Sequence, residues 1–535
     1  MTIGEKIAKL RAGANLSQEQ LAEALSVSRQ SISKWEMDQA TPQCEKIVQL
    51  AEYFNVTTDE LLHEGVSVKP KNAAHRGGYF DTDGFRGEAG VGLTSMDAYK
   101  VGRFLGWYYT GKQSRPGCKA RIVVGKDTRR SSYMIEYSIV AGITASGADA
   151  YMLHVTTTPS VSYVTRCDEF DCGIMITASH NPYYDNGIKI VNRFGEKLDD
   201  ETTALIEAYL DGNLAALGIS SSDLPFATRQ KIGCIVDYAS GRNRYMAYLI
   251  SLASHSYKNL KVGLDCANGA SWAIARSVFS ALGAQTFVIG AEPNGLNVNE
   301  GCGSTHIEAL CHLVKENHLD IGFAFDGDAD RCIAVDENGN IVDGDKILFV
   351  LARRLLSRGM LKGNTVVATV MSNSGLAESL EHEGIRCVQT AVGDRFVYER
   401  MQENNYALGG ESSGHIILKK YATTGDGLLT AIMLTEEVCD NKTPLSRLSA
   451  PVTLYPQLLK NVRVKDKDAA IEDPAVLKEV ERVERLIGGK GRVLLRRSGT
   501  EPVIRIMTEA GTEEKCRAYA DMIATVLNAR GHSVE

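Results

Sequence analysis

The chain has 535 residues, too many for one compact core, so several domains of roughly 100 to 200 residues each are expected. A net charge of −7 argues against a general attraction to nucleic acid or anionic membranes. The twelve cysteines show no spacing that would hold zinc. The start, MTIGEKIAKL, lacks the apolar segment of a signal peptide, and no window has the ~18 apolar residues of a membrane span. A cytoplasmic protein is expected.

The first 64 residues carry only helical signals. Ile3, Ile7 and Leu10 fall on one helical face, which is typical of an amphipathic helix. Five short helices are predicted, and a linker is predicted at 65–78, where Gly, Pro and Lys replace any periodic pattern. The first helix is expected to start near residue 3 and the third at Ser28. Capping boxes at Ser17–Gln20 and Thr57–Glu60 predict the starts of the second and fifth helices, and Pro42 is expected in the first turn of the fourth.

This segment, with SQEQLAEALSVSRQSISKWE at its centre, resembles the Cro/C1-type (XRE-like) helix-turn-helix domain over residues 3–63. The resemblance implies a recognition helix from Ser28 to Trp35 and binding of duplex DNA through residues 1–64, with a homodimer as the expected assembly. Arg and Gln suit base edges there, and Ser and Lys suit phosphates. The positions that would face DNA are Gln18, Arg29, Gln30, Ser33 and Lys34.

The charge of this segment leaves an alternative open. Residues 1–65 hold six Lys and Arg against ten Asp and Glu, a net charge of 6 − 10 = −4. DNA-binding domains usually present a basic face. A helical dimerisation or protein-docking module is therefore the alternative to DNA binding.

Beyond residue 78, short apolar runs alternate with helical patterns. Such alternation indicates an α/β fold with a parallel or mixed sheet covered on both faces, and functional residues are expected in loops after the strand ends. The runs expected to form strands are RIVVGKD, GADAYML, CGIMITA, KVGLDC, LDIGFAF, NTVVATV and RVLLRRSG.

The first candidate site is the stretch Thr177–Pro182, directly after the apolar run GIMI. Ser179 and His180 could suggest a hydrolase dyad, but adjacent side chains are expected to point apart and no G-x-S-x-G elbow surrounds the serine. The turn residues around Ser179 favour an exposed reactive loop, with a plain polar turn as the alternative.

The second candidate site is the acidic stretch Asp326–Arg331, which follows the run IGFAF. Carboxylates at alternate positions of an extended loop would point to one side and suit a hard cation such as Mg²⁺. A calcium EF-hand is excluded, because Arg331 stands at the sixth position, where glycine makes the turn, and the flanks are strand-like. A solvated acidic turn is the remaining alternative.

Two further stretches suit a phosphosugar. Arg496–Pro502 combines guanidinium groups, hydroxyls and a glycine, as in a phosphate cradle. In Gly409–His415, glycines let the backbone approach a ligand, while Glu411 and Ser413 could bind vicinal hydroxyls.

Together these stretches, with YFDTDGFRG at 79–87, resemble the α-D-phosphohexomutase superfamily in the same order along the chain. The resemblance implies three related α/β domains and a smaller α+β domain around one cleft. The expected domains are residues 79–225 with the phosphoserine loop, 226–335 with the metal loop, 336–450 with the sugar loop and 451–535 with the phosphate loop.

The resemblance also implies a role for each residue in a phosphohexose mutase that works through phosphoserine, Mg²⁺ and a hexose 1,6-bisphosphate. Ser179 is expected to carry the phosphoryl group, which Arg86, His180 and Lys189 would contact while they assist proton transfer, and Arg331 would contact the substrate at the same site. The metal ion would be held by Asp326, Asp328, Asp330 and the phosphorylated Ser179. The sugar hydroxyls would be bound by Glu411 and Ser413, and the second phosphate by Arg496, Ser498, Gly499, Thr500 and Arg505.

Within the superfamily, the stretches NGLNVNEGCGSTH, VGDR and TTGDG resemble the phosphoglucosamine mutase branch. Asp81, Ala329 and Ser412 depart from the usual residues of that branch, and Ser412 lies between the two expected sugar ligands. The expected reaction is interconversion of glucosamine 6-phosphate and glucosamine 1-phosphate. Two alternatives stay open: a phosphomannomutase or phosphoglucomutase, and a DNA-binding regulator that uses the mutase fold as a sugar-phosphate sensor.

Overall fold

Two compact units make up the chain, Met1–Asp81 and Thr82–Glu535. No helix among the described residues is long and apolar enough to cross a membrane. The computed structural model describes residues 2–13, 17–25, 27–54, 78–81, 84–111, 118–489, 491–498 and 503–534.

The first unit contains the N-terminal helices, and the capping box predicted at Ser17–Gln20 is confirmed, whereas the one predicted at Thr57–Glu60 lies outside the described residues. The amide of Ser17 donates to Oε1 of Gln20 at 2.7 Å, and the amide of Gln20 donates back to Oγ of Ser17 at 3.2 Å. Pro42 lies two residues before the fourth helix rather than in its first turn. The predicted fifth helix and almost all of the predicted linker lie outside the described residues. The described helices are α1 (Ile3–Gly13), α2 (Gln18–Ala24), α3 (Arg29–Glu36) and α4 (Cys44–Tyr53).

The helices of this unit enclose one small apolar core. Apolar residues recur at helical spacing on α1 to α4, and burying that face is what stabilises such short helices. The buried apolar side chains are Ile7, Leu10, Leu21, Ala22, Leu25, Ile32, Trp35, Ile47, Leu50, Ala51 and Phe54.

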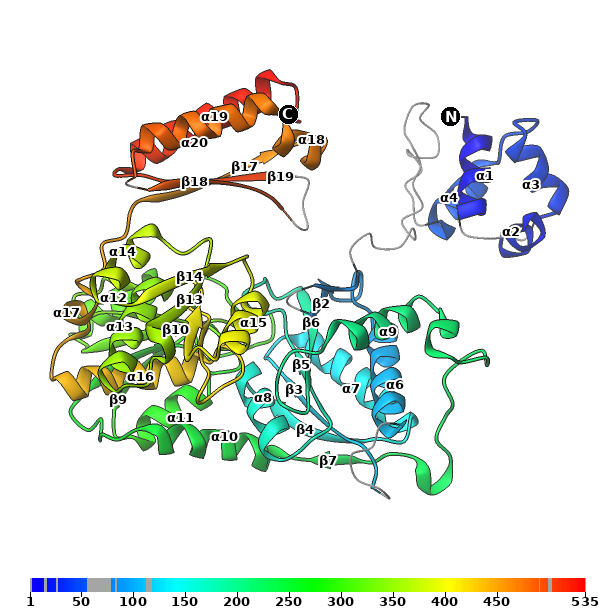
Figure 1. The fold of residues 1–535 in the computed structure, drawn as a ribbon. Helices are drawn as coiled ribbons and strands as arrows, with labels where there is room; N and C mark the ends of the chain where they lie inside the picture. The colour runs from blue at the N-terminus through cyan, green and yellow to red at the C-terminus, as the bar shows by residue number, and fades with distance from the viewer. Residues whose placement is uncertain are drawn as a thin grey trace. The chain divides into compact units, whose positions relative to one another are not determined.

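The first sheet of the second unit is mixed, in the order β2-β6-β5-β3-β4-β7. Strands β3, β4, β5 and β7 run parallel, and the pairs β5–β6 and β2–β6 are antiparallel. Figure 1 shows α7 and α8 on opposite sides of these strands, as two right-handed crossovers in opposite directions require. The strands are β2 (Gly84–Glu88), β3 (Arg121–Lys126), β4 (Asp149–Val155), β5 (Cys172–Ile176), β6 (Asp185–Asn192) and β7 (Ile235–Asp237); β1 (Phe80–Asp81) belongs to the first unit.

The register of this sheet positions a functional edge. Lys126 pairs with Ile176, so β3 and β5 end side by side. The residues that follow, Asp127 and Thr177, therefore meet, and Oγ1 of Thr177 donates to Oδ2 of Asp127 at 2.8 Å. Polar loops gather at this edge, as in other α/β sheets.

Three further sheets follow along the chain, in the orders β12-β11-β10-β8-β9, β14-β13-β15-β16 and β17-β19-β18. Each apolar run predicted to form a strand contains one. The strands are β8 (Lys261–Asp265), β9 (Gln285–Ile289), β10 (Ile321–Phe325), β11 (Cys332–Val335), β12 (Ile341–Val342), β13 (Thr365–Thr369), β14 (Arg386–Thr390), β15 (Leu408–Gly410), β16 (Ile416–Leu418), β17 (Gln457–Arg463), β18 (Arg492–Arg497) and β19 (Val503–Glu509).

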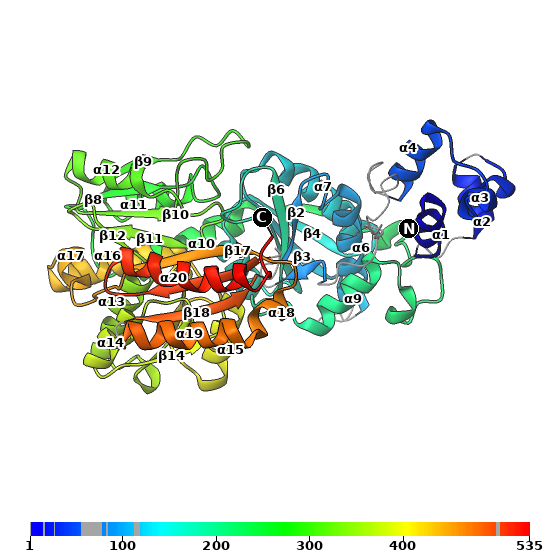
Figure 2. The same ribbon diagram turned by 90° about the horizontal axis from the view of Figure 1, so that it is seen from above.

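Helices cover both faces of the first three sheets, while Figure 2 shows α19 and α20 side by side over the last one. The predicted α/β class, with a smaller α+β domain at the C-terminus, is confirmed. The helices of this unit are α6 (Ser95–Gly111), α7 (Arg130–Ala145), α8 (Thr158–Cys167), α9 (Asp200–Leu210), α10 (Ala239–Leu252), α11 (Ile274–Ala281), α12 (Glu308–Asn317), α13 (Gly344–Ser357), α14 (Ser374–His382), α15 (Asp394–Asn404), α16 (Gly427–Asn441), α17 (Leu445–Ser449), α18 (Lys467–Glu472), α19 (Pro474–Ile487) and α20 (Glu513–Ala529).

Candidate active site

Ser179 follows β5 at the functional edge of the first sheet, and its backbone is left-handed with φ = +51°. Residues other than glycine rarely adopt this conformation outside sites that require it. The prediction of an exposed loop is wrong for Ser179 itself, which is 1% exposed because the loop after β10 covers it. Its hydroxyl donates to Oδ2 of Asp326 at 2.5 Å. The serine therefore faces the predicted metal loop.

His180 lies closer to Ser179 than the sequence predicts. Its Nδ1 is 3.3 Å from Oγ of Ser179, so the expectation that adjacent side chains point apart is wrong here. The left-handed conformation of Ser179 breaks the alternation of an extended chain. The pair still differs from a hydrolase dyad, because the serine hydroxyl donates to Asp326.

The three aspartates of the second loop converge. All three are buried, and one carboxylate oxygen from each lies within 4.8 Å of the others. The loop is a turn rather than the extended segment that the sequence predicts, because Ala329 is left-handed with φ = +56°. That turn, and not strand-like alternation, brings Asp326, Asp328 and Asp330 together.

Positive charge around this cluster comes first from Lys189 on β6. Its ammonium lies 2.6 Å from Oδ2 of Asp328 and 2.9 Å from Oδ2 of Asp330. Burial and the neighbouring carboxylates raise the pKa of Asp326 well above its ordinary value. Burial acts on Asp330 in the same direction, but Lys189 and the other basic groups outweigh it and hold the pKa of Asp330 well below its ordinary value. The ammonium thus offsets only part of the negative charge.

The donor set fits a divalent cation. Oδ1 of Asp328 and Oδ1 of Asp330 are buried and accept no hydrogen bond from any described residue. Such oxygens are costly unless a cation or a donor meets them. Carboxylate oxygens are among the hard oxygen ligands that Mg²⁺ prefers. The cluster could therefore hold a metal ion.

A cavity of about 260 Å³ lies beside these loops. It brings together predicted residues from three of the sheets, which are far apart in the sequence. A larger hollow of about 990 Å³ beside Trp272 and Arg276 contains none of them. The predicted residues that line the smaller cavity are Arg86, Ser179, Asp330, Arg331, Glu411 and Ser413.

The predicted sugar loop follows β15 and closes one side of the cavity. Oε1 of Glu411 accepts from the amide of Gly393 at 3.1 Å, and burial raises the pKa of Glu411. Oγ of Ser413 is buried and has no hydrogen-bond partner among the described residues. Gly414 is required here, since a Cβ would lie 2.3 Å from the carbonyl oxygen of Cys332. The loop thus offers a carboxylate and a hydroxyl to a ligand.

The predicted phosphate loop is described only in part. Arg496 on β18 pairs with Arg505 on β19, and burial, with the charge of Arg505, lowers the pKa of Arg496. Nε of Arg496 is buried without a hydrogen-bond partner among the described residues. Two adjacent guanidinium groups favour an anion between them. Gly499 and Thr500 lie outside the described residues. The described residues of this loop and its strands, Arg496, Ser498 and Arg505, do not line the cavity.

Some of the side chains predicted to contact DNA are instead engaged in contacts within the first unit. Nε2 of Gln18 donates to Oε2 of Glu36 at 2.8 Å, so the side chain of Gln18 is hydrogen-bonded within the unit. Arg29 is exposed but pairs with Glu19 at 2.9 Å, and exposed pairs of this kind are weak. Gln30 and Lys34 are exposed, and Ser33 is half-buried on the same helix, α3.

Sequence reasoning missed several residues at the site. His415 lines the cavity, and its Nε2 accepts from the amide of Gly425 at 3.0 Å, so Nδ1 carries the proton and faces Oδ1 of Asp330 at 3.7 Å. The amide of Thr158 donates to the carbonyl of Asp328 at 3.0 Å. His415 ends a quoted motif and could have been found, whereas Thr158 has no local signal.

Comparison with known families accounts for nearly the whole chain. Residues 77–216, 243–339, 343–455 and 459–526 match the phosphoglucomutase/phosphomannomutase models for α/β/α domain I, domain II, domain III and the C-terminal domain. Residues 7–61 match a helix-turn-helix model.

Curated relatives are similar at high identity. A phosphoglucosamine mutase of Lachnospira eligens is 58% identical over 458 residues, which cover 86% of this chain and 100% of the relative. One from Geobacillus kaustophilus is 49% identical over 453 residues, covering 84% and 98%. The rest of this chain has no counterpart in these matches.

Solved structures show the same fold. A phosphoglucomutase/phosphomannomutase family protein of Burkholderia thailandensis has a TM-score of 0.69 at 23% identity and covers 84% of this chain and 97% of its own. N-acetylphosphoglucosamine mutase of Aspergillus fumigatus, in complex with GlcNAc-6P and magnesium, has a TM-score of 0.59 at 18% identity, with 84% and 96% covered. The chain belongs to the phosphoglucosamine mutase family of the phosphohexomutases and carries an N-terminal helix-turn-helix domain.

Proposed function

We propose that this chain is a mutase that interconverts glucosamine 6-phosphate and glucosamine 1-phosphate through phosphorylated Ser179. The observation that carries the proposal is the hydroxyl of Ser179, which lies 2.5 Å from Asp326 in a buried cluster of three carboxylates. Relatives named phosphoglucosamine mutase, 58% and 49% identical, support the choice of substrate.

The proposed chemistry is two phosphoryl transfers in opposite directions. First, the bond between phosphorus and Oγ of Ser179 breaks as the 1-hydroxyl oxygen of the substrate bonds to phosphorus, and the hydroxyl proton passes to Oγ. The product is a hexose 1,6-bisphosphate, which turns over in the cavity. Then Oγ takes the 6-phosphoryl group and its proton returns to the sugar. His180 and Lys189 are suited to carry the proton, since Nδ1 of His180 lies 3.3 Å from Oγ.

The remaining residues would align the reacting groups. Asp326, Asp328 and Asp330 would hold Mg²⁺, which when bound neutralises charge on the phosphoryl group. Arg86 and Arg331 line the same cavity and would neutralise the rest. The sugar hydroxyls and the second phosphate would be held by Glu411, Ser413, Arg496, Ser498, Gly499, Thr500 and Arg505, which fixes the far end of the substrate.

We expect a higher kcat/KM with glucosamine phosphate than with glucose or mannose phosphates. The hydrogen-bonding groups of the sugar loop would distinguish substrates through the substituents on the ring. Purified protein assayed with the three 6-phosphates and a hexose 1,6-bisphosphate as activator measures this preference. A higher value for glucose or mannose phosphate would assign the chain to the phosphomannomutase/phosphoglucomutase alternative.

Ser412 allows a sharper test of the same choice. It lies between Glu411 and Ser413, lines the cavity and departs from the branch pattern. We expect Ser412→Gln to change the ratio of kcat/KM between glucosamine and glucose phosphates by at least about threefold, with the larger amide reaching the sugar. An unchanged ratio with unchanged kcat would show that Ser412 has no part in the choice.

The N-terminal unit, in this proposal, binds duplex DNA as a dimer. Support comes from the match of residues 7–61 to a helix-turn-helix model and from the exposed side chains of Arg29, Gln30 and Lys34 on α3. Because the unit is acidic overall, binding would depend on this local patch and show a shallow salt slope. Half-sites about one helical turn apart are expected.

Selection from random duplexes by the full-length protein tests DNA binding. We expect an enriched sequence, lower specificity after Gln30→Ala, and uniformly weaker binding after Lys34→Ala. Deletion of residues 1–64 should leave turnover within about twofold, because no predicted catalytic residue lies there. If low salt enriches no sequence, with or without sugar phosphate, the unit is a docking module. DNA binding without mutase activity would instead favour the regulator alternative.

A further inference from the structure

Two backbone carbonyls in the loop of Ser179 are held from both sides. The carbonyl oxygens of Ser179 and Asn181 accept from Nη2 of Arg129 at 2.9 and 2.8 Å. They also accept from Nδ2 of Asn299 at 2.8 and 3.1 Å. Arg129 lies in the loop that follows β3 in the first sheet, whereas Asn299 belongs to the segment that follows β9 in the second sheet. Side chains from two domains therefore bind the same two carbonyl oxygens of the loop.

Every hydrogen-bond donor of the Arg129 guanidinium group is used, and most of them bind carbonyl oxygens of this loop. Its side chain is 0% exposed, and Nη1 donates to the carbonyls of Pro182 and Asp185. Nε donates to Oδ2 of Asp127 at 2.8 Å, so all five donors of the guanidinium group are used. A buried cation with so many carbonyl partners fixes the loop from Ser179 to Asp185 as one body.

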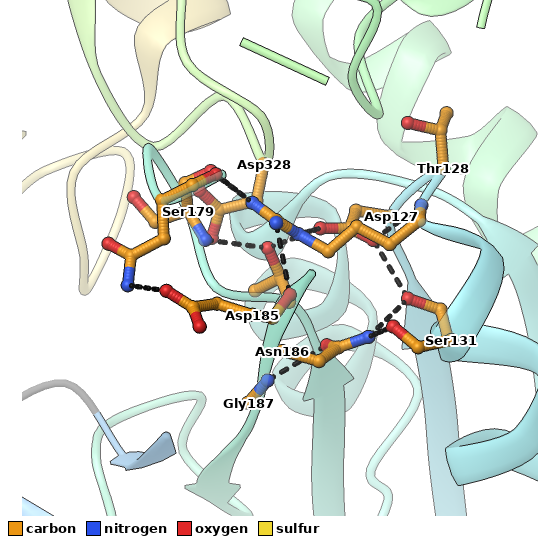
Figure 3. A network of polar contacts seen from close by, with 12 residues as sticks. Asp127, Thr128, Ser131, Ser179, Asp185, Asn186, Gly187 and Asp328 are labelled. Carbon is orange, nitrogen blue, oxygen red and sulfur yellow. Dashed lines mark hydrogen bonds and ion pairs between the residues drawn. The ribbon is translucent and has the colours of Figure 1, made fainter. Parts of the chain in front are cut away.

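Asp127, which directly follows β3 and lies two residues before Arg129, holds the guanidinium group in place. Its two carboxylate oxygens also accept from Oγ1 of Thr177 and Oγ of Ser132, each at 2.8 Å. Figure 3 shows Asp127 and Ser179 joined through this network, with Asn186 and Ser131 bonded beside it. The guanidinium group therefore cannot swing away without breaking a buried ion pair, which is costly.

Asn299 brings the metal loop into the same contact. Asn299 is left-handed with φ = +58° and 7% exposed, and its backbone N–H donates to the carbonyl of Ala267 at 2.9 Å. Gly327 lies between Asp326 and Asp328, and a Cβ on it would be 2.5 Å from the carbonyl oxygen of Ser179 and 3.2 Å from Nδ2 of Asn299. The metal loop, the side-chain amide of Asn299 and the carbonyl group of Ser179 are thus packed against one another.

We infer that Arg129 and Asn299 are positioning residues that form a two-sided clamp on the carbonyls of Ser179 and Asn181. Holding the carbonyl fixes the left-handed backbone of Ser179 and with it the direction of Oγ toward Asp326. The clamp rests on the proposed mutase function, in which Ser179 must accept and donate a phosphoryl group without moving its loop. Phosphoryl transfer depends on such alignment, and a misplacement of about 1 Å can cost about 10²-fold in rate.

Asn299 is the residue to change, because disrupting the buried pair of Arg129 would destabilise the whole domain. Asn299→Gly removes the donor and keeps a residue that tolerates positive φ. Asn299→Asp keeps the shape but turns a carboxylate toward two carbonyls. Asn405→Gly is a matched control: Asn405 is also left-handed, with φ = +54°, and ends α15 on the surface.

We expect Asn299→Gly to lower kcat at least about tenfold and Asn299→Asp by about 10²-fold, with KM for the sugar phosphate within about twofold. Backbone amides of residues 179–185 should exchange hydrogen faster in both variants, since the clamp no longer holds the loop. Asn405→Gly should leave kcat and that exchange unchanged. A general loss of stability would instead raise exchange across the sheet.

The outcomes separate the clamp from the mutase proposal. An active parent whose Asn299 variants keep kcat and loop protection would overturn the clamp. A parent without mutase activity would overturn the proposed function, and hydrogen exchange would then decide the clamp alone. Faster exchange confined to 179–185 in Asn299→Gly supports it, and unchanged exchange overturns it.

Discussion

Replacing Ser179 by glycine or alanine should lower kcat by at least about 10³-fold, which corresponds to about 4 kcal/mol of transition-state stabilisation. In the proposed reaction the hydroxyl of Ser179 accepts the phosphoryl group, so neither variant can complete a cycle. The two variants separate chemistry from backbone strain. Alanine at φ = +51° is strained, whereas glycine adopts that conformation freely.

Tandem mass spectrometry of the active parent should locate a phosphate on Ser179 and on no control serine. Ser138→Ala is the matched control, since among the described residues the hydroxyl of Ser138 donates to the carbonyl of Met134 in its own helix. That variant should keep its kcat within about twofold. If either Ser179 variant retained a tenth of the parent's kcat, the phosphoserine mechanism would be wrong.

Local patterns predicted most of the fold. The run CGIMITA predicts a strand because a continuous apolar segment between turn residues suits a strand buried on both faces, and β5 is buried at every position. The capping box at Ser17–Gln20 predicts a helix start because both partners lie within one turn. In each case the interactions that decide the structure are only a few residues apart.

The clamp could not be predicted in the same way. Arg129 and Ser179 are 50 residues apart, and their contact depends on the pairing of β3 with β5. Asn299 is 120 residues from Ser179 and reaches it only when the second sheet packs against the first. No periodicity or turn chemistry specifies which strand ends become neighbours.

Side-chain directions at the site also escaped sequence reasoning. An extended chain alternates its side chains, and that rule led to wrong expectations for His180 and for the shape of the aspartate loop. Single left-handed residues, Ser179 and Ala329, reverse the local direction in both places. Such conformations are specified by tertiary contacts around the residue, such as the close approach of Gly327 to Ser179, and not by its own preference.

Asp328→Asn should lower kcat at least about tenfold, a loss of about 1.4 kcal/mol of transition-state stabilisation, and raise the Mg²⁺ concentration needed for half-maximal activity. The substitution removes one of three negative charges that would attract the cation. Oδ2 of Asp328 already accepts from Lys189 and Thr158, so only Oδ1, which is buried and accepts no hydrogen bond from a described residue, is available to a metal.

The metal dependence of the parent completes the argument. Burial and the charges of Asp330 and Asp328 raise the pKa of Asp326, and Lys189 supplies only one positive charge to the three buried carboxylates. A chelator should therefore stop turnover and added Mg²⁺ restore it, while Glu316→Gln, which removes one exposed carboxylate from α12, should behave as the parent. Turnover indifferent to the chelator would mean that Asp326, Asp328 and Asp330 only hold Lys189 and the loop of Ser179 in place.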